Sequence, residues 1–590
     1  MSEPPRQHRL MFCDVGREIE GLEGESVLHA ARRAGVRIVG ACGGRGTCGS
    51  CMVRVAQGLA QHHRWRRACQ SRIRSDCTIQ IAPRSLAPVV RAEVGHREDA
   101  PLVADSAIAG RDITVPPASL ADHRSDWDRV AEALDAQVPS PDLDVLSVLP
   151  GLLRTNAWSV RVRLEEGRVL GFAAPGRREL GLAVDLGTTN LAAFLIRLDT
   201  GERLASLGIE NPQAAWGGDV ISRINHAIQA HDGAEELRAA VVRGIDAITQ
   251  DLVRAVGAEV GDVVEAAVCG NTAMHHLLAG LPVTQLGRSP FVPVVSAGLT
   301  PRATALGLAL APGARVHLAP NIGGFVGGDH VAALLASEQH WRSGCCLVMD
   351  IGTNTEISLI HESRIISASC PSGPALEGGH VSCGMRAAIG AIERVKVEAG
   401  RLRVSTIGRK KAVGVCGSGV LDAMAALLEG GMMERSGRIR AGHPDVEEID
   451  GLRSARLAKD IHFTQHDVRA VQLAKSAIRT GMELLLRQAG IEATQLERIV
   501  IAGAFGAYLS VDSAVDIGLL PDLPRERFLQ VGNAAGLGVC RMLVNRADRA
   551  RAQDIARGAR YLELSSIADF QQHFLKHISL NGPWRERKIS

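Results

Sequence analysis

The sequence lacks several signals that would place it in other classes of protein. No run of 18 apolar residues occurs, so a membrane-spanning helix is not expected. Residues 1–16 do not have the charged-then-apolar layout of a signal peptide. The motif G-x4-G-K-[ST] is absent, so P-loop phosphate chemistry is not supported. A net charge of only +3 gives no indication of a nucleic-acid partner.

Length and cysteine content narrow the class further. A chain of 590 residues is too long for one core, so several domains are expected. Thirteen cysteines without an export signal indicate the reducing cytoplasm, where thiols are ligands or core residues. Cys13 is expected in the core. Residues 1–84 hold 14 Arg, no Lys and 7 acidic residues, a basic face that could steer an acidic protein partner or simply be solvated.

Three of the cysteines lie on one glycine-rich loop, ACGGRGTCGSC, within a β-rich unit that has one short helix at residues 26–34. Cys42, Cys48 and Cys51 are spaced C-x5-C-x2-C, one residue different from the plant-type ferredoxin loop. The glycines permit a crowded backbone whose N–H groups can point at sulfur. Four thiolates of this kind can hold a [2Fe–2S] cluster.

The fourth ligand is Cys69 or Cys77. Cys69 is preferred because Cys77 opens an alternating strand at 78–81. A zinc site is an alternative, although zinc favours paired C-x2-C knuckles and this loop has one. A thioredoxin-like pair at Cys48 and Cys51 lacks a βαβ context, and the G-x-G-x-x-G match at 44–49 lacks a flanking strand and long helix.

Downstream, a pair of similar segments stands 165 residues apart. LAVDLGTTNL at 182–191 and LVMDIGTNTE at 347–356 are each an apolar strand, a glycine turn and a second strand. The glycine lets backbone N–H groups approach a phosphate, threonine hydroxyls add donors, and an Asp at the strand end can hold Mg²⁺ through water. Two such turns predict a duplicated domain that grips one nucleotide from both sides.

Two strand-to-helix turns fit the same plan. One is AAVCGNTAMH at 266–275 and the other IVIAGAFGAY at 499–508. The small residues Gly503, Ala504 and Gly506 are the better candidates for contact with adenosine, because a flat ring can lie against exposed backbone.

Taken together, these motifs resemble the superfamily of acetate and sugar kinases, heat-shock chaperones and actin, and more narrowly the reductive activators of corrinoid proteins. The resemblance covers nearly the whole chain. Its narrower marks are NPQAAWGGDVISRI (211–224), GNTAMHHLL (270–278), NIGGFVGGD (321–329), DIGTNTEI (350–357), SGPALEGG (372–379), GMRAAIGAI (384–392), CGSGVLDA (416–423) and AGAFGAYL (502–509).

The resemblance implies a multidomain fold and its boundaries. We expect an N-terminal β-grasp [2Fe–2S] ferredoxin-like domain, a linker, a small α+β middle domain, a duplicated α/β ribonuclease-H-like ATPase of the actin and sugar-kinase type in two halves, and a tail. The expected boundaries are, in this order, 1–84, 85–115, 116–178, 179–570 and 571–590.

The implied activity is ATP-dependent reductive activation of a corrinoid methyltransfer protein, in which the [2Fe–2S] cluster passes one electron to reduce Co(II) to Co(I). The implied partners are that cobalamin-binding protein and an external low-potential donor (a ferredoxin, a flavodoxin or a separate reductase), since no flavin or nicotinamide domain is evident. The family also implies a homodimer. No membrane or nucleic-acid partner is expected.

The resemblance also assigns roles to residues of this sequence. The cluster ligands would be Cys42, Cys48, Cys51 and Cys69. ATP phosphates and Mg²⁺ would be held by Asp185, Gly187, Thr188 and Thr189 on one side and by Asp350, Gly352, Thr353 and Asn354 on the other. Adenosine would meet Gly503, Ala504 and Gly506. Candidate acidic residues in the cleft are Asp219, Asp329 and Glu377, which could otherwise be helix caps or ion-pair partners.

Two other functions stay open from the sequence. The protein could be an ATP-driven electron donor to another low-potential enzyme, although such activators usually carry cysteines inside the ATPase fold. It could also be a binding module without enzymatic activity, in which nucleotide regulates the docking of a ferredoxin. ATP turnover stimulated by an oxidised corrinoid protein would separate these.

The two predicted sites are on separate domains, which gives a first test. Cys48→Ser should abolish the visible absorption of the cluster and leave ATP binding intact, because the loop and the phosphate turns share no residues. Absorption spectroscopy and ATP titration of the same preparation measure both. Loss of ATP binding as well would mean that the two domains do not fold independently.

Overall fold

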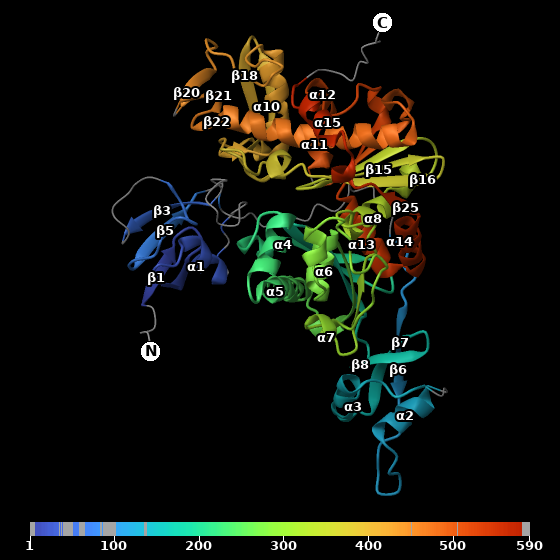
Figure 1. The fold of residues 1–590 in the computed structure, drawn as a ribbon. Coiled ribbons are helices and arrows are strands. Elements are labelled where there is room, and N and C mark those ends of the chain that lie inside the picture. The colour runs from blue at the N-terminus through green and yellow to red at the C-terminus, as the bar shows by residue number, and fades with distance from the viewer. Residues whose placement is uncertain are drawn as a thin grey trace.

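The computed structural model describes residues 6–34, 36, 38, 51–57, 65–82, 85, 102–134, 138–449, 451–503 and 505–580. Figure 1 shows three parts: an N-terminal β domain in blue, a small domain in cyan, and two large lobes in green and in yellow to red. No helix in the described part of the chain is long and apolar enough to cross a membrane.

The N-terminal domain is a five-stranded sheet of order β2-β1-β5-β3-β4, with one helix on it. Alternating residues of β1, including Leu10 and Phe12, are fully buried, which is the pattern of a sheet with one covered face. Cys13 is exposed rather than in the core, because it lies in the turn that follows β1. The elements are β1 (Gln7–Phe12), β2 (Arg17–Leu22), α1 (Val27–Arg33), β3 (Met52–Gln57), β4 (Arg66–Arg67) and β5 (Cys77–Ile81).

The small domain is a three-stranded antiparallel sheet of order β6-β7-β8 with its own apolar core. The linker expected at 85–115 therefore contains a full strand, because β6 pairs with β7 along its whole length. Its Ile113 is buried in the core that α2 and α3 cover. The elements are β6 (Ile108–Thr114), α2 (Asp126–Ala133), α3 (Leu143–Thr155), β7 (Ser159–Glu165) and β8 (Arg168–Ala173).

The first lobe is built on a mixed sheet of order β11-β10-β9-β12-β13. Its central strand β9 has the sequence LGLAVDL and is buried at six of seven positions, which is why it contains almost no polar residue. The elements are β9 (Leu180–Leu186), β10 (Asn190–Arg197), β11 (Arg203–Glu210), α4 (Val220–Gln229), α5 (Gly233–Ala255), β12 (Val263–Gly270), α6 (Thr272–Ala279), α7 (Ala303–Leu306), β13 (Arg315–Leu318), α8 (Gly328–Ala336) and α9 (Glu338–Trp341).

The second lobe is built on a sheet of order β24-β23-β14-β15-β16-β25, with two small three-stranded sheets, β18-β17-β19 and β20-β21-β22, inserted. Its elements up to the last helix of the chain are β14 (Cys346–Ile351), β15 (Thr355–His361), β16 (Arg364–Cys370), β17 (Ala391–Glu398), β18 (Arg401–Thr406), β19 (Gly414–Val415), α10 (Gly417–Glu429), β20 (Val446–Ile449), β21 (Leu452–Ala458), β22 (Ile461–Thr464), α11 (Gln465–Ala489), β23 (Arg498–Ala502), α12 (Val511–Asp516), β24 (Phe528–Gly532) and β25 (Ala559–Tyr561).

The two lobes repeat one topology. In the main sheet of each lobe, the first strand along the chain forms an antiparallel hairpin with the second strand and pairs in parallel with the fourth. These strands are β9, β10 and β12 in the first lobe and β14, β15 and β23 in the second. The duplication expected from the two Asp-x-Gly-Thr turns is therefore present in the strand order itself, with β25 added at one edge of the second sheet.

The two lobes are not two continuous segments of the chain. Helices α13 (Ala534–Val544) and α14 (Arg546–Gly558) come late in the chain, yet they pack with β9, β12 and α8 of the first lobe. The chain then returns to the second lobe and ends in α15 (Phe570–His577), which lies along α11. The tail expected at 571–590 therefore includes a docked helix, since residues 570–580 are described and Leu580 is buried.

The contact between α13 and α8 depends on a glycine. A Cβ at Gly538 would lie 2.0 Å from the carbonyl oxygen of Ala332, so Gly538→Ala should force the helices apart. We expect a loss of about 1–3 kcal/mol of unfolding free energy, seen as a lower Tm. The control is Gly151→Ala inside α3, where the new Cβ meets no described atom within 4 Å. There the exchange should raise stability by about 0.5–1 kcal/mol, and equal Tm values for the two variants would contradict the packing.

Candidate functional site

The structure describes two of the four expected cluster ligands and brings them to one end of the N-terminal sheet. Cys51 precedes β3 and Cys69 follows β4, and these strands pair through Met52 and Arg67. The backbone N–H of Ala68 donates to the carbonyl of Cys51 at 2.6 Å, and both thiol side chains are buried. Cys42 and Cys48 lie outside the described residues.

Cys77, the alternative fourth ligand, lies at the opposite end of the same sheet. It opens β5, which runs antiparallel to β3, so that Ile81 pairs with Val53 near Cys51 while Cys77 is near the far end of β3. The length of β5 separates the two thiols by about 15 Å. Burial, helped by Asp76, raises the pKa of Cys77 to about 11, which disfavours the thiolate that a cluster needs.

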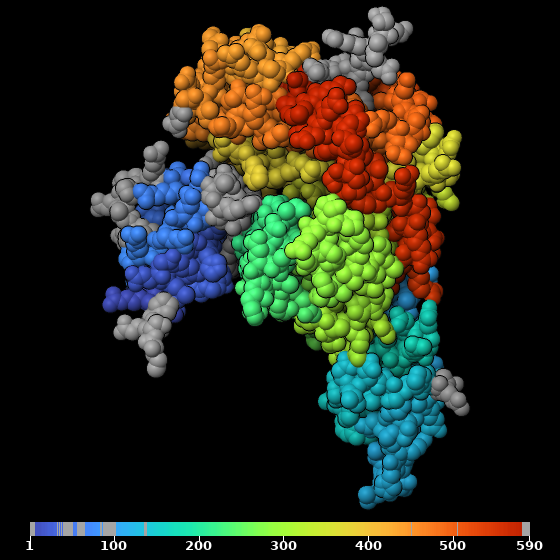
Figure 2. Space-filling model, viewed as in Figure 1, coloured from blue at the N-terminus to red at the C-terminus, as the bar shows by residue number. Residues whose placement is uncertain are grey.

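The two Asp-x-Gly-Thr turns meet between the lobes. Thr189 Oγ1 and Thr353 Oγ1 are 2.8 Å apart, and Thr353 Oγ1 donates to Glu377 Oε2 at 2.8 Å. Because a threonine hydroxyl has one proton, Thr189 is the donor to Thr353. Figure 2 shows the yellow and orange lobe resting on the green one.

Three polar residues that we did not single out hold the first turn in shape. Asn271, the N-cap of α6, donates through Nδ2 to Thr188 Oγ1 at 2.9 Å, and Asn211 donates to the carbonyl of Gly187 at 2.8 Å. Buried Arg223 donates to the carbonyl of Thr188. All three lie within motifs that carried the family resemblance, so their polarity among small and apolar neighbours was the available signal.

The cleft gathers most of the expected carboxylates. Asp185, Asp329, Asp350 and Glu377 all come from elements that border it, and each is half-buried. Burial raises the pKa of Asp185 to about 6 and that of Asp329 to about 7. Burial and the charges of its acidic neighbours raise the pKa of Asp350 to about 8. Burial also raises the pKa of Glu377.

One carboxylate of this group was missed, and one predicted member has a local capping role. Glu356 on β15 is buried, and its burial together with Asp329 and Asp350 raises its pKa well above the usual value. Its position in a strand gave no sign of a cleft residue. Asp219 instead caps α4, where it accepts hydrogen bonds at 2.7 Å from the backbone and the hydroxyl of Ser222.

This acidic group fits a divalent cation bound mainly through water. Several carboxylates that raise one another's pKa are stabilised by a positive charge placed among them. Within the described chain, no three of them bring ligand oxygens within 4.8 Å of one another. Mg²⁺ commonly keeps several waters and uses one or two carboxylates plus substrate phosphates, which suits this spacing.

The expected adenosine turn lies directly beside the second phosphate turn, because Ala502 of β23 pairs with Asp350 of β14. Gly503 has φ +95°, and a Cβ there would lie 2.6 Å from the carbonyl oxygen of Ile351 and 2.8 Å from Asp350 Oδ1. Only glycine fits this close approach. Gly506 opens a short 3-10 helix, and Ala504 lies outside the described residues.

The space between the lobes is small in this conformation. A cavity of about 80 Å³ lies between the lobes. Its lining includes Thr189 and Glu210 of the first lobe and Glu377 and Arg386 of the second. Sites for drug-sized ligands usually measure about 300–1,000 Å³. This cavity is smaller than that range, and the Thr189–Thr353 hydrogen bond joins the two predicted phosphate turns beside it.

A ferredoxin-like sheet joined to two lobes of one repeated topology defines the class of protein: a ferredoxin-type domain fused to a domain of the actin and sugar-kinase fold. Family models agree along the chain. They match a 2Fe-2S iron-sulfur cluster binding domain at 11–74, the RACo linker region at 97–179, the RACo middle region at 180–342, and the C-terminal domain of RACo, the ASKHA domain, at 344–586.

Individual relatives extend this match to full length. The chain is 31% identical over 592 residues to the corrinoid activation enzyme RamQ of Eubacterium limosum, covering 96% of this chain and 98% of that protein. It is 28% identical over 436 residues to the [Co(II) methylated amine-specific corrinoid protein] reductase of Methanosarcina barkeri, covering 68% and 76%. The solved reductive activator for corrinoid,iron-sulfur protein matches with a TM-score of 0.73 at 30% identity, covering 97% and 98%. The chain belongs to the family of reductive activators of corrinoid proteins.

The raised pKa of Asp350 predicts how stability depends on pH. The folded state keeps this proton up to a pKa of about 8, whereas the usual value is 3.8, so the free energy of unfolding of the nucleotide-free protein should fall as pH rises between these values. Asp350→Asn cannot ionise and should remove part of the fall. It should match the wild type near pH 4 and exceed it by about 1 kcal/mol or more above pH 8.

Thermal unfolding across this pH range measures the effect, and the exposed Asp554→Asn is the control. If the Asp350 variant keeps the pH dependence of the wild type, the carboxyl is ionised throughout and the assignment is wrong.

Proposed function

We propose that this protein reduces a corrinoid methyltransfer protein from Co(II) to Co(I) in an ATP-dependent reaction, passing it one electron from a [2Fe–2S] cluster. The observation that carries the proposal is the full-length match to a corrinoid activation enzyme, which spans the N-terminal domain and both lobes together. When bound, the cluster would supply a one-electron donor, and ATP with Mg²⁺ a hydrolysable phosphate anhydride. A separate low-potential donor, a ferredoxin, a flavodoxin or a reductase, returns the electron.

Cys42, Cys48, Cys51 and Cys69 would hold the cluster. The shared end of β3 and β4 supports the pair Cys51 and Cys69, and the strand register argues against Cys77. Arg66 beside this end is exposed, and an acidic surface of the partner is complementary to it.

The phosphate turns would hold ATP from both lobes. Asp185, Gly187, Thr188 and Thr189 present one set of donors and a carboxylate, and Asp350, Gly352, Thr353 and Asn354 present the other. Gly503, Ala504 and Gly506 would lie against adenosine, which the glycine conformation at 503 supports. Mg²⁺ would be held near the acidic group that includes Asp329 and Glu377.

The closed cleft suggests how nucleotide could assist an unfavourable electron transfer. A plant-type ferredoxin has a potential of about −400 mV, which is not low enough to reduce a Co(II) corrinoid readily. ATP can help only if the two states of the lobes bind the corrinoid partner differently. The Thr189–Thr353 hydrogen bond joins the lobes in this structure, and we expect it to differ between those two states.

The decisive experiment follows the Co(I) absorption band of a Co(II) corrinoid protein under anaerobic reduction, with and without ATP. We expect Co(I) to form only with ATP, and the variants Cys48→Ser and Asp350→Asn each to abolish it while the cluster spectrum survives in the second. Co(I) formation at the same rate without ATP would overturn the proposal.

Two further outcomes would favour the other functions. ATP hydrolysis that no corrinoid protein stimulates, with electron transfer to another low-potential enzyme, would favour a different acceptor. Nucleotide-dependent binding of a ferredoxin without turnover would favour a binding module.

A further inference from the structure

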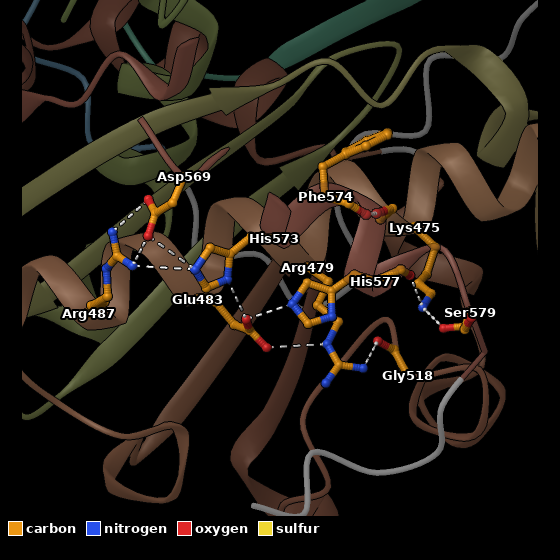
Figure 3. A network of polar contacts seen from close by, with 11 residues as sticks. Lys475, Arg479, Glu483, Arg487, Gly518, Asp569, His573, Phe574, His577 and Ser579 are labelled. Carbon is orange, nitrogen blue, oxygen red and sulfur yellow. Dashed lines mark hydrogen bonds and ion pairs between the residues drawn. The ribbon is translucent and has the colours of Figure 1, made fainter. Parts of the chain in front are cut away.

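The end of the chain carries a cluster of metal-ligating side chains far from the cysteine loop in sequence. Helix α15 lies along α11, and His573 and His577, four residues apart, share one face of α15 opposite Glu483 of α11 (Figure 3). We call these three residues the C-terminal triad. In the described part of the chain, it is the one group in which three such side chains bring their ligand atoms within 4.8 Å of one another.

The distances within the triad are close to those of a metal site. Glu483 Oε2 lies 2.6 Å from His577 Nε2 and 3.5 Å from His573 Nδ1. Ligands of a tetrahedral ion with bonds of about 2.1 Å lie about 3.4 Å apart. The contact between Glu483 and His573 already has this value. The contact between Glu483 and His577 would reach it if one of the two side chains moved by less than an ångström.

Hydrogen bonding within the cluster leaves a nitrogen unused. His573 Nδ1 is buried and makes no hydrogen bond within the described structure, although it faces the carboxylate. An imidazole nitrogen in this state has either a lone pair without a donor or a proton without an acceptor. The side chains of His573 and Glu483 keep about a fifth of their surface exposed, so a cation can reach them from solvent.

Residues around the triad provide the outer partners that metal sites use. Asp569 Oδ2 lies 3.5 Å from His573 Nε2. A guanidinium only donates, so the contact of Arg487 with Nε2 places the proton of a neutral His573 on Nδ1. Binding of a metal at Nδ1 therefore requires this proton to leave or to move to Nε2, where Asp569 would accept it. Arg487 contacts Asp569 through both Nη atoms and approaches His573 Nε2 at 3.3 Å. Arg479 approaches the other carboxylate oxygen of Glu483 at 3.5 Å. Arg487 is thus matched by Asp569, whereas Arg479 shares Glu483 with the triad.

The C-terminal triad lies between α11 and α15, so an ion bound there would link the two helices. The end of α15 and the residues after it are attached to α11. Lys475 Nζ donates to the carbonyls of His577 and Ser579, and Gln472 donates to that of Ile578. Helix α11 itself is well defined, from a capping box at Thr464 to Gly490 in the left-handed conformation. Ser476 of α11 also donates to the carbonyl of Phe574 in α15. The triad adds a contact between side chains of the two helices.

We propose that Glu483, His573 and His577 form a binding site for a divalent transition-metal ion of the zinc class, with water in the fourth position, and that the ion fastens α15 to α11. Two imidazoles and one carboxylate are ligands that Zn²⁺ accepts, and two histidines four residues apart on a helix can bind one ion together. The site is independent of the proposed electron transfer.

The test uses the full-length protein with its iron content measured, dialysed to equilibrium against buffered Zn²⁺. Zinc per chain is then read by elemental analysis for wild type, for His573→Gln and for His577→Ala. His573 is partly exposed, so its conservative replacement should fold even if the buried His577 variant does not. We expect both variants to bind Zn²⁺ at least about tenfold more weakly, with iron unchanged.

The matched control is His462→Ala. His462 Nε2 lies 2.6 Å from Glu447 Oε1, the same kind of histidine–carboxylate contact as in the triad, but it belongs to no group of three. This variant should keep the zinc of the wild type. If the zinc were bound at cysteines instead, the zinc content of every variant would equal that of the wild type, which would contradict the proposal.

A second reading separates a metal site from a simple hydrogen-bonded contact. Added Zn²⁺ should raise the Tm of the wild type and of His462→Ala and leave that of His573→Gln unchanged. Equal zinc content and equal Tm shifts in wild type and His573→Gln would overturn the proposal, as would an equal loss of zinc in His462→Ala.

Discussion

Repulsion among carboxylates in one cleft is the constraint on which the two-lobed part of the structure depends. Asp185 and Asp350 occupy equivalent positions in a repeated topology, so the duplication places one carboxylate on each side of the cleft. Raised pKa values at Asp329 and Asp350 are the consequence of burial without a nearby cation. The hydroxyl contact between Thr189 and Thr353 joins the two turns beside these carboxylates, and a cation among them would lower their pKa values.

The two lobes are also connected away from the cleft, through helices α13 and α14. Helices α13 and α14 follow the second sheet in sequence but pack on the first, and the carboxylate of Asp185 is reached by Asn533, the N-cap of α13. A movement that opens the cleft must therefore also act on a helix that belongs to the far end of the chain. The same connection offers a physical route by which nucleotide binding could change surfaces away from the phosphates.

Much of the fold and part of the site could be predicted. The hairpins, their glycine turns and the expected strands of the N-terminal domain were visible because strand periodicity and turn chemistry are local properties. Asn211, Arg223 and Glu356 were not predicted, because their roles depend on which backbone they meet after folding. Residues 85–115 were expected to be a linker with at most a short strand, because the pairing partner of β6 lies some fifty residues further along. For Asp219, the structure shows the capping role that the sequence left open as an alternative to a role in the cleft.

The sequence alone determined the family, the duplicated ATPase fold and the cysteine loop, since each rests on short motifs whose meaning is local. Only the tertiary structure decided which distant residues meet. Strand register put Cys69 beside Cys51 and Cys77 at the other end of the sheet. Helix packing put Glu483 opposite two histidines about ninety residues away. Such pairings follow from the long-range burial of apolar faces, and no local pattern encodes which faces will be buried together.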